Sequence, residues 1–297
     1  MPAVGMRFRC RLRGRRSSNW YLSDRSFVRR GLVIRRKTSE YFVRGSSRIA
    51  IRNNLWVDVE TYETGGIDKA ATQDALLVAF VGDALRLAVI DGVTPTRRTR
   101  GFRGVDGAVW AAGVVRTLLG GSDQSIVDVM RAANQALWSA EVMNSRDQQQ
   151  ATALVAEIRC KEHVLHATLA RAGDCMAWIK TGESWTRLFS PVAHSPEVRK
   201  EVDEWFRSNP DETRDRNEQF AMEERLAGSP DAWRTSALGR FREPVIETAE
   251  IDISGELVIA TDGLCGCSAD PAQELTTMTF SPTDVASIHL KNLSQFN

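Results

Sequence analysis

Five aspartates stand where short apolar segments of this sequence begin or end, and their carboxylates are its best-placed groups for chemistry. They are Asp74, Asp91, Asp174, Asp262 and Asp284. Glycine follows Asp91 and Asp262, so the backbone there can approach an ion closely and offer a carbonyl oxygen as well. Hard oxygen donors without histidine or cysteine favour Mg²⁺ or Mn²⁺ over Zn²⁺. The pattern indicates a divalent-metal site, although each aspartate taken alone also fits an ordinary turn.

The segments that must position these aspartates show strand and helix patterns. Short apolar runs predict strands at 75–80, 85–90, 152–160, 163–170, 175–180, 256–261 and 286–290. Helical spacing of apolar residues predicts helices at 109–119 and 125–143. A charged segment rich in helix formers predicts a helical flap insertion at about 195–231. This order predicts an α+β fold in which helices pack on antiparallel sheets.

The first 54 residues differ from the rest in charge. Fourteen Arg and one Lys stand against Asp24 and Glu40, which gives +13, while the remaining 24 basic and 36 acidic residues give −12. Such a segment buries little apolar area, so we expect residues 1–54 to be disordered or peripheral and ordered structure to begin near Trp56. An arm for nucleic acid or an anionic surface, a solvated tail and a start codon assigned too early are the alternatives. Residues 55–297 then form the main domain.

Bulk composition limits the class of protein. The chain has 297 residues, of which 42% are hydrophobic, enough for one large domain. Its five cysteines are scattered and odd in number, which argues against a disulfide framework and favours a reducing cytoplasm. No apolar run approaches the roughly 20 residues that span a bilayer, so we expect no membrane span.

Seven short motifs follow one another along most of the chain. They are Thr72-Gln73-Asp74-Ala75, Ala88-Val89-Ile90-Asp91-Gly92, Ala151-Thr152-Ala153, Arg171-Ala172-Gly173-Asp174-Cys175, Arg234-Thr235-Ser236-Ala237-Leu238-Gly239, Ile259-Ala260-Thr261-Asp262-Gly263-Leu264 and Asp284-Val285-Ala286-Ser287-Ile288. Their sequences and their order resemble the protein phosphatase 2C family in its bacterial form, the metal-dependent serine/threonine phosphatases. Each motif is weak alone, and their shared order carries the resemblance.

The resemblance implies a β-sandwich of two antiparallel sheets flanked by helices, with a metal centre at one end. It makes Asp91 and Asp262 the central ligands, helped by the Gly92 carbonyl. Asp74 and Asp284 complete a site for two Mn²⁺ or Mg²⁺ ions, and Asp174 with Asp262 holds a third, weaker ion. A metal-activated water then hydrolyses phosphoserine or phosphothreonine without a nucleophilic side chain.

The resemblance also implies a residue that contacts the phosphate and a class of substrate. Where the family usually has an arginine, this chain has Lys69, which can hold a phosphate as a point charge but not in bidentate geometry. The implied substrate is a phosphoprotein, with the chain opposing a serine/threonine kinase and acting as a cytoplasmic monomer. The alternative is a catalytically inactive module that keeps the fold and binds a phosphoprotein or a regulatory partner.

Overall fold

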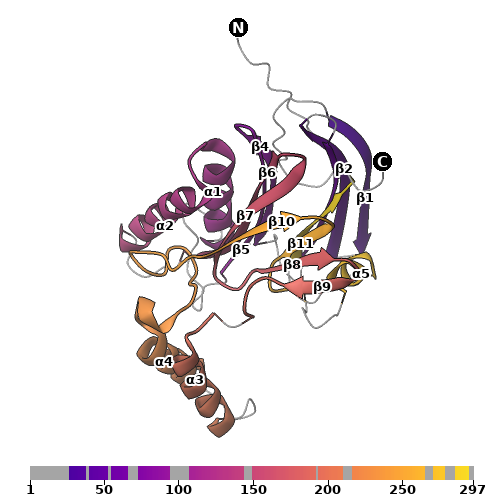
Figure 1. Cartoon of the computed structure of the whole chain (residues 1–297). Coiled ribbons are helices and arrows are strands. Elements are labelled where there is room, and N and C mark those ends of the chain that lie inside the picture. Colours follow the sequence, from indigo (N-terminus) through magenta and orange to yellow (C-terminus); the bar gives the residue numbers. More distant parts are fainter. Residues whose placement is uncertain are drawn as a thin grey trace.

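Two antiparallel sheets pack face to face, with two helices on the outer side of the smaller sheet (Figure 1). The computed structural model describes residues 27–37, 40–52, 55–65, 73–93, 107–143, 149–191, 193–209, 216–264, 270–277 and 285–293. The predicted α+β sandwich is confirmed at the level of the fold.

The five-stranded sheet has the order β10-β7-β6-β5-β4. Its strands are β4 (Asp74–Val81), β5 (Ala84–Gly92), β6 (Ala151–Lys161), β7 (Val164–Ala172) and β10 (Glu247–Ile253). The predicted hairpin at 75–90 is present, because β4 and β5 pair antiparallel across a turn at Gly82 and Asp83. Strand β10, at the edge, was not predicted.

The seven-stranded sheet has the order β1-β2-β3-β12-β11-β8-β9. Its strands are β1 (Phe27–Lys37), β2 (Glu40–Arg52), β3 (Leu55–Gly65), β8 (Met176–Thr181), β9 (Ser184–Arg187), β11 (Glu256–Ala260) and β12 (Val285–Asn292). The core between the sheets combines residues of both, among them Leu87 and Val89 from β5 with Ile259 and Ile288 from β11 and β12.

A second apolar layer joins the smaller sheet to helices α1 (Gly107–Gly121) and α2 (Ile126–Met143). Residues of β5 alternate, so Leu87 faces the other sheet while Ala88 and Ile90 face the helices. In α2 the buried positions recur at helical spacing, as Ile126 and Met130 illustrate. Both predicted helices are therefore confirmed, and both faces of β5 are covered.

The structure differs from the expectation for the basic start of the chain. Strand β2 pairs with β1 on one side and with β3 on the other, so these strands extend the larger sheet at its edge. Ile49 of β2 is 1% exposed and belongs to the core between the sheets. Ordered strands thus begin before Trp56, since β2 lies between β1 and β3 and places Ile49 in the core. The division of the chain at residue 54 stays a prediction.

A helical hairpin projects from one end of the body (Figure 1). It consists of α3 (Pro196–Ser208) and α4 (Arg216–Ala227), followed by the short helix η3 (Pro230–Ala232). Ser195 caps α3, since its hydroxyl accepts a hydrogen bond from the Val198 amide. The helical character predicted for the 195–231 insertion is present. The last helix, α5 (Pro271–Thr277), packs near the larger sheet, and no helix in the described residues is long and apolar enough to cross a membrane.

Candidate metal centre

Asp74 and Asp91 lie directly opposite each other on neighbouring strands of the smaller sheet. The next pair along is Gln73 and Gly92, and the Gly92 amide donates a hydrogen bond to the Gln73 carbonyl at 3.1 Å. In an antiparallel ladder the pair beside a hydrogen-bonded pair is the closely spaced one. The two carboxylates therefore project side by side. They share the face of Val89, so they point between the sheets at the end of the sandwich.

The larger sheet reaches this pair through Thr261, which directly follows β11. Its Oγ1 donates to Asp74 Oδ2 at 2.9 Å and accepts from the Ala286 amide at 3.0 Å. Thr261 is fully buried and Asp74 is 6% exposed, so water competes little for this bond. The contact fixes the end of β11 against the start of β4. Asp262, the next residue, is thereby held beside the Asp74–Asp91 pair with an exposed side chain.

Asp174 lies in the link by which the chain crosses from β7 in one sheet to β8 in the other. Gly173 before it has φ +90°, and a Cβ at this position would overlap the side chain of Thr152. The Gly173 amide donates to Thr235 Oγ1 at 2.9 Å, and that hydroxyl donates to the Arg171 carbonyl at 3.0 Å. Asp174 is thus presented from a tightly held turn. Its Oδ1 is buried and accepts no hydrogen bond from the described residues.

The pKa of the Cys175 thiol reflects its burial and the negative charge of the aspartates around it. Burial raises the pKa of its fully buried thiol well above the usual value, and the charge of Asp174 raises it further. Asp91 and Asp262 act in the same direction, while the hydrogen bond with Thr152 opposes them. Three of the predicted ligands therefore place negative charge around one position. The same effects keep the thiol protonated, which makes Cys175 a poor nucleophile.

The predicted ligand set is brought together in part. Gly92 lies where a Cβ would overlap the carbonyl oxygen of Ala108, so the sequence must keep the backbone bare there. Asp284 and Lys69 lie outside the described residues. Within those residues, no three His, Cys, Asp or Glu side chains stand close enough to hold an ion by themselves. The ligand atoms that do gather are carboxylate oxygens, and among the described residues the buried Asp174 Oδ1 has no hydrogen-bond partner. This chemistry fits Mg²⁺ or Mn²⁺.

Sequence reasoning missed the residues that hold the aspartates in place. Thr152, Thr235 and Thr261 each form a hydrogen bond to the loops or carboxylates of the site, and Arg171 contacts the Asp174 link. All four lie inside the motifs named above. Their signal was a polar residue next to an apolar strand, which predicts burial with a specific partner but does not say which one.

Comparison with known proteins places the fold. No protein-family model matches the sequence, and no curated protein is significantly similar to it. The serine/threonine phosphatase Stp1 from Staphylococcus aureus is 13% identical with a TM-score of 0.53, covering 79% of this chain and 94% of that one. The Mycobacterium tuberculosis serine/threonine phosphatase PstP is 15% identical with a TM-score of 0.52, covering 80% and 99%. RsbX, solved in complex with magnesium, is 14% identical with a TM-score of 0.51, covering 83% and 99%.

These solved structures are bacterial phosphatases of the protein phosphatase 2C type, so this chain has the protein phosphatase 2C fold. The resemblance derived from the seven motifs is confirmed to that extent. Nearly the whole length of each compared structure is covered, together with about four fifths of this chain.

Proposed function

We propose that this protein hydrolyses phosphoserine and phosphothreonine on proteins with the help of divalent metal ions. The observation that carries the proposal is the opposition of Asp74 and Asp91 on adjacent strands, beside the turn that bears Asp262. Crowded carboxylates repel one another in the absence of a cation. A bound cation best explains a fold that holds these carboxylates together at the ends of neighbouring strands.

The proposed roles are those that the family resemblance implies. Asp91 and Asp262 would hold the ions centrally with the Gly92 carbonyl, Asp74 would orient one of them, and Asp174 would serve a weaker site. When bound, Mn²⁺ or Mg²⁺ supplies Lewis acidity toward the phosphate oxygens and lowers the pKa of water.

The chain's own side chains keep the ligands oriented. Thr261 holds the Asp74 carboxylate by its hydroxyl, and Thr235 fixes the Gly173 amide before Asp174. Such hydrogen bonds to the ligands and to their loops set geometry and affinity at metal sites. Lys69 is the proposed phosphate contact, and Asp284 is the proposed remaining ligand. The substrate is a phosphoprotein whose modification a serine/threonine kinase supplies.

The test uses the full chain, because β1 and β2 are part of the sheet. Hydrolysis of para-nitrophenyl phosphate and of a phosphothreonine peptide is measured with Mn²⁺, with Mg²⁺ and with EDTA. We expect turnover to require the metal and to fall more than about 100-fold in Asp262→Ala. The matched control is Asp123→Ala, an exposed aspartate in the α1–α2 turn, which should retain activity.

Calorimetric titration of Mn²⁺ adds a readout that does not depend on turnover. Asp91→Ala and Asp262→Ala should lose the strongest binding, whereas Asp123→Ala should not. Folded protein that binds Mn²⁺ but shows no turnover with any metal would reject the catalytic function in favour of the binding module. Turnover that persists in EDTA would reject the metal mechanism.

A further inference from the structure

A groove of about 440 Å³ lies between helix α3 and the body of the protein, outside the candidate metal centre. Its charged lining consists of Arg199, Lys200, Asp203, Arg207 and Arg234, and we call it the basic groove. Four cations against one carboxylate give the lining a formal charge of +3. A concave surface with one sign of charge concentrates ligands of the opposite sign.

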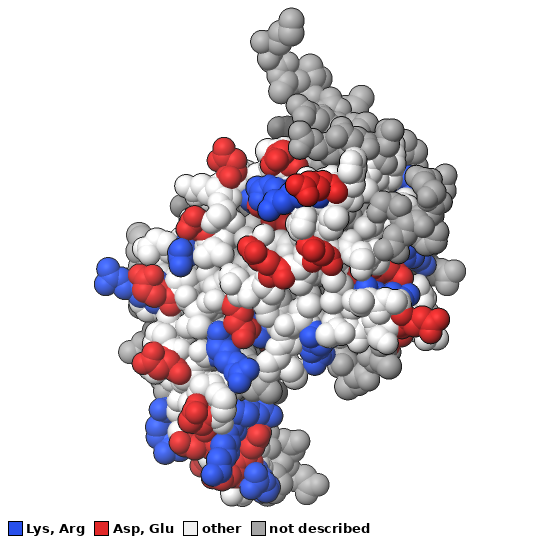
Figure 2. Space-filling model, viewed as in Figure 1, with Lys and Arg blue, Asp and Glu red and all other residues white. Residues whose placement is uncertain are grey.

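Most of this positive charge is uncompensated. Arg199 forms an ion pair with Asp203 at 2.9 Å, one helical turn further along α3. Lys200, Arg207 and Arg234 form no ion pair or side-chain hydrogen bond with any residue of the described part of the chain. Figure 2 shows basic side chains, with acidic ones among them, over the helical hairpin at the bottom of the view. As far as the described residues go, three cations thus remain available to an anionic ligand in the groove.

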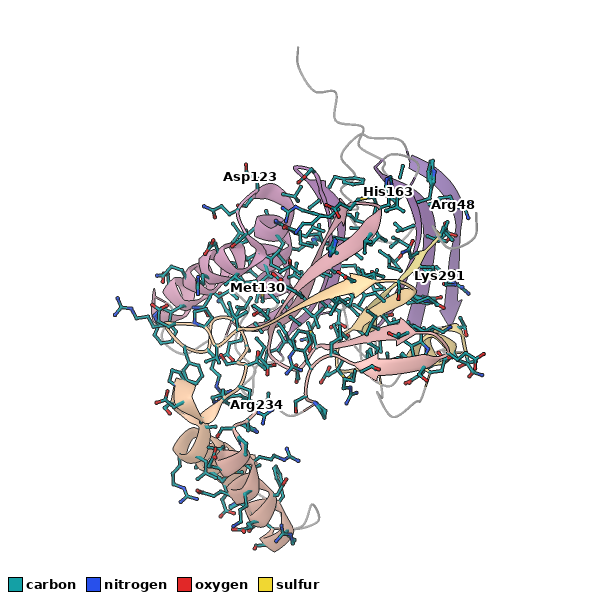
Figure 3. All side chains as sticks on the ribbon, in the orientation of Figure 1. Arg48, Asp123, Met130, His163, Arg234 and Lys291 are labelled. Atoms are coloured by element: carbon teal, nitrogen blue, oxygen red, sulfur yellow. The ribbon has the colours of Figure 1, made fainter. Side chains whose placement is uncertain are left out.

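The two walls of the basic groove come from different parts of the fold. Arg199, Asp203 and Arg207 recur every four residues and therefore lie along one side of α3. Arg234 lies where the hairpin joins the body (Figure 3) and lines the groove together with them. Its backbone amide donates to the Ala193 carbonyl at 2.8 Å, which fixes this wall. The groove is therefore a built feature of the hairpin junction, lined by charges from α3 and from the segment that follows η3.

A direct connection links the basic groove to the candidate metal centre. One nitrogen of the buried Arg171 side chain, Nη1, donates to the Ser190 carbonyl at 2.8 Å and to the Cys175 carbonyl at 3.4 Å. Ser190 lines the groove, and Cys175 directly follows Asp174. Both segments contact a single atom, so the groove starts close to the loop that carries a proposed metal ligand.

We propose that the basic groove binds an acidic segment of the protein substrate, next to the phosphorylated residue. This proposal rests on the proposed phosphatase function, because it assumes that the phosphorylated residue is hydrolysed at the candidate metal centre next to the groove. Arginine and lysine form charge-assisted hydrogen bonds with carboxylates, and three unpaired cations suit a short run of Asp or Glu. Nucleic acid suits it less well, because single strands are tracked over several nucleotides by longer basic surfaces with aromatic platforms.

The test removes the three unpaired cations together, as Lys200→Ala/Arg207→Ala/Arg234→Ala in the full chain. Fluorescence anisotropy measures binding of a labelled peptide of six glutamates and of a neutral peptide of equal length. Each exposed pair contributes a few-fold, so we expect the dissociation constant for the acidic peptide to rise about tenfold. Binding to the unaltered protein should also weaken with added salt.

The matched control removes three cations elsewhere, as Arg116→Ala/Arg131→Ala/Lys161→Ala, and should bind the acidic peptide like the unaltered protein. Equal losses in both triple variants would show a general charge effect and overturn the proposal. So would tighter binding of a single-stranded oligonucleotide than of the acidic peptide.

A kinetic arm separates this proposal from the proposed function. The ratio of kcat/KM for an acidic phosphothreonine peptide to that for a neutral one should fall about tenfold in the groove variant. An unchanged ratio, with active enzyme, would overturn the groove as a substrate site. Absence of metal-dependent hydrolysis of both peptides would defeat the phosphatase proposal instead, while the anisotropy measurement would still decide whether the groove binds acidic peptide.

Discussion

Two arginines are fully buried in the part of the chain that the structure describes, and they hold different regions together. Arg86 in β5 and Arg171 in β7 are both 0% exposed, and each is paired with a glutamate. The partner of Arg86, Glu157, is itself buried, whereas Glu247 beside Arg171 keeps 24% of its side chain exposed. The remaining hydrogen bonds of each guanidinium show what it positions.

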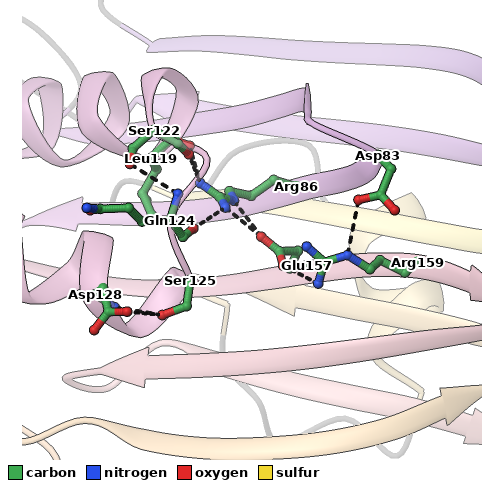
Figure 4. A network of polar contacts seen from close by, with 9 residues as sticks. All are labelled: Asp83, Arg86, Leu119, Ser122, Gln124, Ser125, Asp128, Glu157 and Arg159. Carbon is green, nitrogen blue, oxygen red and sulfur yellow. Dashed lines mark hydrogen bonds and ion pairs between the residues drawn. The ribbon is translucent and has the colours of Figure 1, made fainter.

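Arg86 holds the two helices onto the smaller sheet (Figure 4). It donates to the carbonyls of Leu119 at 2.8 Å, Ser122 at 2.9 Å and Gln124 at 3.0 Å, and to the Glu157 carboxylate. These carbonyls belong to the end of α1 and the turn into α2, where a helix leaves its last carbonyls without partners. Arg86 lies near the start of β5, at the opposite end from Asp91. Its contacts are therefore structural.

Arg171 holds the link that carries Asp174. Its guanidinium contacts the Cys175 and Ser190 carbonyls and lies 4.9 Å from the centre of the Phe189 ring. The same chemistry, a buried guanidinium among carbonyls and one carboxylate, thus stabilises a helix junction in one region and a candidate ligand loop in the other. The comparison teaches that burial alone does not mark a functional residue, because what the residue holds decides its effect.

The largest effect on stability is expected from Arg86→Leu. Among the described residues, the substitution leaves the buried Glu157 carboxylate with only Arg159 as a partner, at 2.6 Å, and it removes the hydrogen bonds to three carbonyls. Breaking a buried pair in this way costs about 3–5 kcal/mol. Urea unfolding should show this loss, while the Mn²⁺ affinity of the folded variant stays unchanged.

The control for Arg86 is Arg131→Leu, which removes an exposed ion pair with Asp128 and should change stability by no more than about 0.5 kcal/mol. A loss below about 1 kcal/mol in Arg86→Leu, or a weakened Mn²⁺ affinity, would contradict the assignment of Arg86 to structure alone.

Arg171→Leu is expected to give a smaller stability loss and a second effect. Glu247 stays partly solvated when its partner is removed, so we expect a loss of about 2–3 kcal/mol. The Asp174 link loses the contact to the Cys175 carbonyl, and Mn²⁺ affinity should fall about tenfold by calorimetry. Arg171→Lys, which keeps the charge but not the fork of donors, should recover only part of this affinity. Unchanged Mn²⁺ binding in Arg171→Leu would contradict the claim that Arg171, unlike Arg86, positions a metal ligand.

Strands with a continuous apolar run and helices α1 and α2 were predictable from the sequence, whereas strands without such a run were not. β6 and the inner part of β5 are covered on both faces, so each shows a continuous apolar run. β10 is at an edge and alternates in burial, with only Ile253 fully buried, so its sequence contains no such run. β1 and β9 are edges as well. A search for apolar runs finds β4 although it lies at an edge, and it misses β2 and β3 in the interior of the larger sheet.

The aspartates of the candidate site could be proposed from the sequence, but the contacts that hold them could not. Asp74 and Asp91 stood out because each borders an apolar strand and belongs to a recognisable motif. The Thr261 hydroxyl contacts Asp74 from 187 positions away in the chain and from the other sheet. Such a contact follows from how the sheets pack, which no local pattern encodes. The hydrogen bonds of Arg171 depend in the same way on the crossing between sheets.

The smallest effect concerns a third glutamate ion pair, on the larger sheet. A hydrogen bond from His289, with Nε2 2.6 Å from Oε2, lowers the pKa of Glu256 to about 2. Burial opposes this shift, and a hydrogen bond from Lys180 at 2.8 Å supports it. Because the pKa is lower in the folded protein than the ordinary 4.5, ionised Glu256 stabilises the fold above about pH 4.5. That contribution disappears as the pH falls from about 4.5 toward 2.

Glu256→Gln should therefore lower stability at pH 7 by no more than about 1 kcal/mol, since the pair is partly exposed to solvent. The difference from the unaltered protein should shrink as urea unfolding is repeated from pH 5 down to pH 3. The exposed Glu250→Gln in β10 is the matched control and should show no such convergence. If the stability difference of Glu256→Gln stayed constant over this range, its carboxylate charge would not be the stabilising feature. The contrast among the three glutamates would then reduce to packing of their side chains.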